Sequence, residues 1–208
     1  MNTNSFEGIR ILTSAEAVRC RPQMYFNVDD PDVAATLAMQ ALCHAVDDAI
    51  DDRCTRIRMR IDGAEIEVRY DSGMPLDHDA EHPERSIAQA FLTIHAACHS
   101  RKRHLEVGSD LCQIGLAVLN AVCSKLTADI RQGGKQVLMT FERGELIEGN
   151  GPAVSSTEEP DETRLRFALD SQVLPKNQPA EDALRRALGD VRSRLPKLKI
   201  EMEYAHRD

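Results

Sequence analysis

Apolar residues recur at helical spacing in the first long patterned stretch of the chain, residues 37–49: Leu37, Ala38, Ala41, Leu42, Ala45 and Ala49. Asp29 and Asp30 can cap the start of a helix, and Pro31 suits its first turn. The spacing therefore predicts one long amphipathic helix that continues to about Asp52.

An imidazole and several carboxylates share the polar side of this predicted helix. His44 and Asp48 are four residues apart, and Asp47 and Asp51 lie one turn along, so their side chains are expected to be neighbours. Two interpretations stay open at this point. The cluster either holds a cation or a proton relay, or forms a solvated acidic face at the end of a helix.

Strict alternation of polar and apolar residues predicts the strands. Residues 56–61 and 64–70 alternate on either side of Asp62-Gly63, which is a strong signal for a β-hairpin. The other predicted strands are 125–131, 136–143, 163–169 and 199–204, with Gly133-Gly134 as a second hairpin turn. Asp71 follows the second strand, where a carboxylate can either meet a ligand or begin a turn.

Four further helices are predicted: a short one capped at Ser14 that ends near Arg21, one through residues 87–94, one from about 111 to 123, and one over 180–195. Residues 98–110 are predicted to form a basic loop and residues 155–162 an acidic loop. The order of elements predicts an α+β fold with helices on one face of a mostly antiparallel sheet. We expect one domain, residues 13–208, preceded by an N-terminal arm of residues 1–12.

Composition narrows the class of protein. The 208 residues are 42% hydrophobic and 29% charged, which suits one globular domain, and the net charge of −8 argues against direct binding of nucleic acid or a membrane surface. The sequence shows neither an apolar signal-peptide core nor a membrane-spanning run, so we expect a cytoplasmic protein. Its six cysteines lack the paired spacing of a zinc module and are expected to be reduced.

The run from Ile11 to Phe26 resembles the opening of the ATPase domain of DNA gyrase B and topoisomerase IV, which typically reads Leu-x-x-Leu-x-Ala-Val-Arg-x-Arg-Pro-x-Met-Tyr-Ile. The resemblance continues through residues 46–52, 71–75, 115–121, 141–144 and 163–167. It implies the GHKL (Bergerat) fold, a two-layer α/β sandwich that binds Mg-ATP between helices, sheet and a Gly-rich lid. It also implies that the transducer domain that follows in the family is absent here.

The resemblance further implies roles for individual residues. Asp71, or Tyr70 in a slipped register, falls where an aspartate binds the adenine amino group, and Thr163 falls where a threonine supports that contact. The wall of the pocket corresponds to Gly73, Met74 and Pro75. Asp48 replaces the asparagine that binds magnesium, and Gly115 is the last glycine of the lid. The implied cofactors are therefore ATP and Mg, and the implied ligand is an adenine nucleotide.

The departures from the family pattern lie at the phosphate end. His44 stands where the family has the glutamate that activates water, and a side chain such as Asp110 replaces glycine in the lid. A histidine can serve as a base, but the family's activating lysine comes from the transducer. The favoured function is a degenerate ATP-binding or regulatory module with weak or no hydrolysis. The alternatives are an active ATPase using His44, or a pseudoenzyme that binds no nucleotide and acts through protein contacts.

Two expectations concern partners and metals. The N-terminal arm, with Phe6 as an anchor, could join two copies in a homodimer, and a gyrase or topoisomerase subunit is a second candidate partner. A zinc site would require convergence of His44, Cys43, His95, Cys98, His99 and Cys112, whose spacing is not that of a known zinc module.

Overall fold

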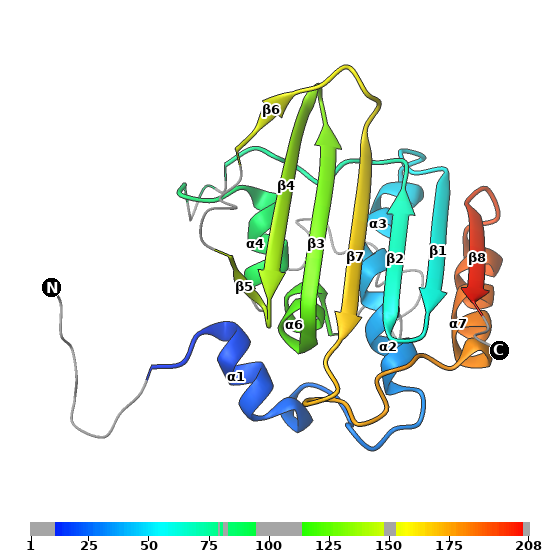
Figure 1. Cartoon of the computed structure of the whole chain (residues 1–208). Helices are drawn as coiled ribbons and strands as arrows, with labels where there is room; N and C mark the ends of the chain where they lie inside the picture. The colour runs from blue at the N-terminus through cyan, green and yellow to red at the C-terminus, as the bar shows by residue number, and fades with distance from the viewer. Residues whose placement is uncertain (1–10, 79, 81–82, 95–113, 148–152, 206–208) are drawn as a thin grey trace, which may run out of the picture.

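In the computed structural model of the chain, residues 11–78, 80, 83–94, 114–147 and 153–205 are described. They form an eight-stranded mixed sheet with the helices packed on one face (Figure 1). The strands are β1 (Arg56–Asp62), β2 (Glu65–Tyr70), β3 (Cys123–Gln132), β4 (Lys135–Glu142), β5 (Glu145–Leu146), β6 (Ser155–Ser156), β7 (Glu162–Leu169) and β8 (Lys199–Ala205). The helices are α1 (Ser14–Cys20), η1 (Pro22–Met24), α2 (Val33–Met39), η2 (Gln40–Leu42), α3 (Cys43–Ile50), α4 (Ile87–Thr93), α6 (Leu116–Val122) and α7 (Glu181–Arg194).

The sheet has the strand order β5-β4-β3-β7-β2-β1-β8, and β6 pairs with the first two residues of β4. All of its strand pairs are antiparallel except β1 with β8, which is parallel. The hairpin predicted at Asp62-Gly63 joins β1 to β2, and Gly63 adopts a φ of 63° that favours glycine. The predicted α+β class with helices on one face is confirmed.

The prediction of one long helix ending near Asp52 is wrong. The segment is divided into α2, the 3₁₀ turn η2 and α3, and Gln40 opens the turn with a fully buried side chain. The Gln40 amide donates to the carbonyl of Thr36 (2.7 Å) and accepts from the backbone N–H groups of Ile114 (3.2 Å) and Gly115 (3.0 Å). The last two partners lie 74 and 75 residues away, so local spacing cannot reveal them.

Other boundaries shift for local reasons. The cap of α1 is Thr13, not Ser14, because Thr13 and Glu16 exchange the two hydrogen bonds of a capping box. The expected acidic loop of residues 155–162 contains β6 and the first residue of β7. The basic loop of residues 98–110 and Phe6 lie outside the described residues.

A buried ion pair fixes α1 against the rest of the domain. Arg19 donates to Asp170 just after β7 (2.5 Å) and to the carbonyl of Ala121 in α6 (2.9 Å). The two charged side chains are only 16% and 7% exposed. Burial alone would raise the pKa of Asp170, but hydrogen bonds from the Gln172 N–H and from Arg19 lower it, so the carboxylate stays ionised.

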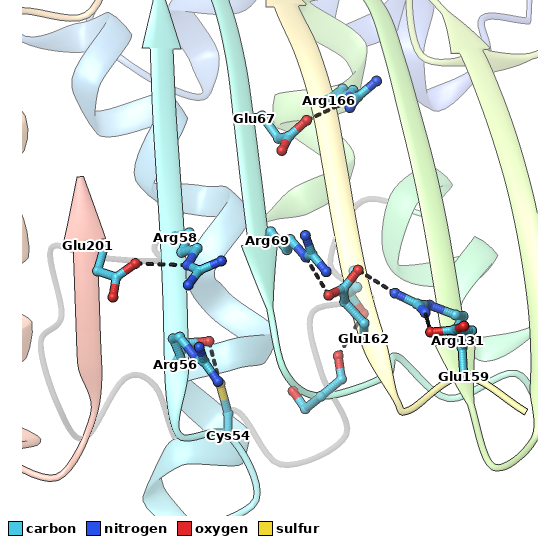
Figure 2. Close-up of polar contacts among 12 residues, drawn as sticks. Cys54, Arg56, Arg58, Glu67, Arg69, Arg131, Glu159, Glu162, Arg166 and Glu201 are labelled. Atoms are coloured by element: carbon cyan, nitrogen blue, oxygen red, sulfur yellow. Dashed lines mark hydrogen bonds and ion pairs between the residues drawn. The ribbon is translucent and has the colours of Figure 1, made fainter. Parts of the chain in front are cut away.

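The face of the sheet that carries no helix is covered by paired charges (Figure 2). Glu162 accepts from both Arg69 and Arg131, and Arg58 pairs with Glu201 across β1 and β8. A groove of about 470 Å³ on this face is lined by charges of both signs: Arg60, Asp62, Glu65, Glu67, Lys125 and Arg166. Alternating charge of this kind differs from the continuous basic track that binds a phosphate backbone. That the protein does not contact nucleic acid directly stays a prediction.

None of the helices in the described residues has the length and apolar character that a membrane span requires. Cys20, Cys54 and Cys123 are free thiols, and burial raises the pKa of Cys54 to about 12. Cys43 takes part in a disulfide bond, so the expectation of reduced thiols is wrong at this position.

Candidate functional site

The acid and imidazole cluster of α3 is buried. His44, Asp47 and Asp48 are 4%, 1% and 5% exposed, so the interpretation of a solvated acidic face is wrong. The helix turns these side chains toward the inside of the domain, where an ionised carboxylate needs a partner. The question is then which group supplies the positive charge.

That group is a side chain that the sequence patterns did not single out. Arg53 donates to Oδ1 of Asp48 from Nη2 (2.5 Å) and Nε (3.2 Å), and its Nη1 lies 3.2 Å from Oδ2 of Asp51. One guanidinium therefore joins two carboxylates at the C-terminal end of α3. The available signal was that a basic residue directly follows the acidic run ending at Asp52.

His44 lies among rings as well as acids. Its ring centroid is 6.0 Å from that of Tyr70 and 6.4 Å from that of Phe91, and its Nδ1 is 3.7 Å from Oδ2 of Asp48. Burial lowers the pKa of His44, opposed by Asp48 and Asp47, which act to raise it. The ring is therefore neutral at pH 7, a weakened base that is almost wholly shielded from water.

Asp71 is bound by the start of β1. One carboxylate oxygen accepts from the backbone N–H groups of Thr55 (2.8 Å) and Arg56 (2.9 Å) and lies 3.4 Å from the Cys54 thiol, and the other accepts from the Thr55 hydroxyl (2.5 Å). These hydrogen bonds join the turn after β2 to the start of β1, so Asp71 has a structural role in the turn. A role toward adenine stays a prediction.

These bonds predict an acid-sensitive contribution to stability. Burial acts to raise the pKa of Asp71, but the hydrogen bonds from Thr55 and Arg56 lower it below its usual value of 3.8. Its contribution is therefore present above pH 4 and is lost as the pH falls through the lowered pKa. In urea unfolding between pH 5 and pH 2, Asp71→Asn should be less stable by about 1–2 kcal/mol at pH 5 and show a shallower loss toward pH 2. Parallel curves for the two proteins would contradict this role.

Thr163 fastens the turn that follows β2. It pairs with Tyr70 in the sheet, and its hydroxyl donates to the carbonyl of Ser72 (2.9 Å) and accepts from the N–H of Met74 (3.1 Å). Met74 is fully buried, and the carbonyl of Pro75 accepts from the N–H of Ala88 in α4 (2.9 Å). The residues predicted to line an adenine pocket are thus brought together, and they are held by one another.

Gly73 is required by close approach of the backbone. A Cβ atom there would lie 2.2 Å from the carbonyl oxygen of Arg131 and 2.5 Å from Cβ of Gln132. We expect Gly73→Ala to lower the free energy of unfolding by about 3 kcal/mol, because the turn cannot move without breaking its bonds to Thr163. Gly189→Ala in α7 is the matched control, since nothing lies within 4 Å of its added Cβ. Denaturant unfolding should show a gain of about 1 kcal/mol for that variant, and an equal loss in both would show that the close approach is unimportant.

The last glycine of the expected lid stands at the start of α6. Gly115 is the N-cap with a φ of 91°, and its N–H and that of Ile114 both donate to the side-chain oxygen of Gln40. The N–H group of Gly115, the glycine that the resemblance places in the lid, thus has an acceptor within the chain. The other lid positions, including Asp110, lie outside the described residues.

No cluster of three or more possible ligands that could hold a metal ion occurs within the part of the chain that the structure describes. His44 and Cys43 belong to that part, whereas His95, Cys98, His99 and Cys112 of the hypothetical zinc site lie outside it. At the position predicted for magnesium, Asp48 already carries the guanidinium of Arg53.

The sequence has relatives among the B subunits of DNA gyrase and DNA topoisomerase IV. No profile of a known protein family matches it. The chain is 28% identical over 208 residues to the DNA gyrase B protein of Thermotoga maritima, covering 98% of this chain and 32% of that protein. It is 27% identical over 146 residues to the DNA topoisomerase IV B protein of Francisella tularensis, covering 69% of this chain and 23% of the relative.

A solved structure gives the same fold. The ATP-binding domain of topoisomerase IV from Francisella tularensis, in complex with a small-molecule inhibitor, superposes with a TM-score of 0.74 at 23% identity, covering 93% of this chain and 91% of that one. The chain is homologous to the ATPase region of gyrase B and topoisomerase IV B. It spans about a third or less of the length of the two curated relatives.

The gyrase-B-like fold brings His44, Asp48, Asp71 and Thr163 into one region, between α3 and the adjoining strands. The resemblance did not indicate which residues of the chain itself bind these groups. Arg53 pairs with Asp48, Gln40 accepts from the start of α6, and Thr55 donates to Asp71. In the part of the site that the structure describes, a nucleotide or a metal ion would therefore have to displace partners that belong to the chain itself.

Proposed function

We propose that this gyrase-B-like domain is a degenerate GHKL module that acts through protein contacts and does not turn over ATP. The observation that carries the proposal is the environment of His44. The side chain at the position of the family's water-activating glutamate is a neutral imidazole that is 4% exposed and lies beside Tyr70 and Phe91. A base in this setting has neither the strength nor the access to solvent that activation of water requires.

The donors at the phosphate end support the same proposal. Catalysis of phosphoryl transfer depends on donors and cations directed at developing charge. Here Gln40 accepts from the N–H groups of Ile114 and Gly115, and Arg53 neutralises Asp48. Gln40 and Arg53 would have to be displaced before a nucleotide phosphate or a metal could use their partners. This favours a pseudoenzyme over an active ATPase that uses His44.

The experiment is a phosphate-release assay on purified protein with saturating Mg-ATP, beside the ATPase region of Thermotoga maritima gyrase B as a positive control. We expect the control to turn over and this chain to match the buffer blank. Turnover by this chain that requires magnesium would refute the proposal.

A homodimer formed through the N-terminal arm is the form of protein contact that one observation favours. Ile11, at the start of the described residues, is 83% exposed, and Met24 beyond α1 is 70% exposed. Each of these apolar side chains would be removed from water if the arm and the segment after α1 lay against a second copy. Light scattering of the full chain and of a variant lacking residues 1–12 should show a dimer only for the former. A gyrase or topoisomerase subunit is the alternative partner. Equal monomer masses for both proteins would rule out the homodimer.

A further inference from the structure

The acidic end of α3 has a positive partner that belongs to the chain itself. The carboxylate of Asp48 is 7% exposed and meets Arg53 through two donors, and Asp51, 24% exposed, takes the third. Both donors reach the same oxygen of Asp48, Oδ1, and because both partners are charged these hydrogen bonds are stronger than those between neutral groups. The Arg53 side chain is 49% exposed, so its charge stands between the acids and solvent.

The backbone directs Arg53 to this place. After α3 ends at Ile50, Asp52 adopts a φ of 56°, which reverses the chain. The N–H groups of Arg53 (2.8 Å) and Cys54 (3.4 Å) then donate to the carbonyl of Asp48. The guanidinium returns along the helix end toward Asp48. A cation at the C-terminal end of a helix is also favoured by the helix dipole.

Charge balance explains why such a partner matters. An ionised carboxylate that is buried beside a second carboxylate is costly unless a cation offsets it. A divalent ion and a guanidinium can both do so, but two cations at one carboxylate repel each other, so Arg53 at Oδ1 of Asp48 disfavours a metal ion there. A tethered guanidinium also needs no binding step, so its effective concentration is high.

We propose that Arg53 takes the place of a divalent cation at Asp48 and makes this site independent of metal. The proposal rests on the proposed function, since a domain that turns over no ATP has no need of magnesium there. It goes further in naming the residue that excludes the ion. Asp48 keeps a cationic partner without metal, and the site binds Mg²⁺ or Mn²⁺ only when the guanidinium is removed.

The test uses Mn²⁺ as a paramagnetic probe, measured by electron paramagnetic resonance and by broadening of the His44 ring signals in NMR spectra. Wild type and Arg58→Ala, which removes an exposed arginine paired with Glu201, should bind no Mn²⁺ near His44. Arg53→Ala and Arg53→Gln should bind it at least about tenfold more tightly, a change equal to about 1.4 kcal/mol. Arg53→Lys should resemble wild type, because a cation is retained.

Two results would overturn the proposal. If the wild-type protein binds Mn²⁺ and its His44 ring signals broaden, Arg53 does not exclude metal. This measurement uses only the wild-type protein, so it does not depend on the folding of a variant. Equal affinity of wild type and a folded Arg53→Gln protein would show that the guanidinium is not the competitor. Neither result measures ATP turnover. The proposed function is tested separately, because only magnesium-dependent release of phosphate would refute it.

Discussion

With saturating Mg-ATP, wild type and His44→Ala are expected to release phosphate at the same rate as a buffer blank. A positioned general base contributes about 10²- to 10⁴-fold to such reactions, and one charge-stabilising donor about 10²- to 10³-fold. His44 is a shielded, weakened base, and the donors at Ile114 and Gly115 are taken by Gln40. Even with partial additivity, these two deficits leave no useful turnover.

The matched variants make this result decisive. Turnover by wild type that disappears in His44→Ala would make His44 the base and would contradict the proposed function. His44→Glu should also match the blank, because Gln40 and Arg53 still occupy the groups at the phosphate end; a gain of turnover in this variant would show that the site accepts Mg-ATP and would contradict the account. Circular dichroism should show an unchanged fold for His44→Ala, since alanine favours a helix. His44→Glu adds a buried carboxylate beside Asp47 and Asp48, so it should keep the helical spectrum but unfold at a lower urea concentration.

Arg19→Met is expected to lower the free energy of unfolding by about 3–5 kcal/mol, the largest effect on stability that we predict. The substitution leaves the Asp170 carboxylate, 7% exposed, without its closest cation; the remaining one, Arg143 at 4.0 Å, has a side chain that is 60% exposed. It also removes the bond from Arg19 to Ala121 that joins α1 to α6. Urea unfolding at pH 7 measures the loss.

Two controls separate this ion pair from a general effect of lost charge. Arg58→Met breaks an exposed pair with Glu201 and should cost less than about 1 kcal/mol. The double variant Arg19→Met, Asp170→Asn should recover part of the loss, because no unpaired charge then remains buried. An Arg19→Met protein as stable as Arg58→Met would show that the buried pair does not hold α1.

Local sequence signals were sufficient for most of the sheet. The hairpins at Gly63 and Gly133-Gly134 were predicted because glycine at positive φ and period-two alternation are local properties, and these glycines have the expected φ. The α7 helix, Glu181–Arg194, also lies within a residue of its predicted bounds. By contrast, the break at Gln40 depends on hydrogen bonds from backbone groups 74 and 75 residues away.

In the candidate site too, some features could be predicted from the sequence and others depend on contacts between distant parts of the chain. The resemblance brought His44, Asp48, Asp71 and Thr163 into one region, but it could not state which partners they have. Arg53 reaches Asp48 because Asp52 adopts a left-handed conformation that is rare outside glycine, and a sequence pattern does not reveal this reversal. The four donors to Asp71 come from residues 54–56, whose approach is set by pairing of β1 with β2.

Titration of the full chain with ATP and with a nonhydrolysable analogue, each with and without magnesium, tests most directly whether the site is satisfied by its own residues. Isothermal calorimetry is the measurement. We predict no saturable binding stronger than about 1 mM, equivalent to about 4 kcal/mol, under any of the four conditions. Micromolar binding that requires magnesium and is weakened in Asp71→Asn would contradict this.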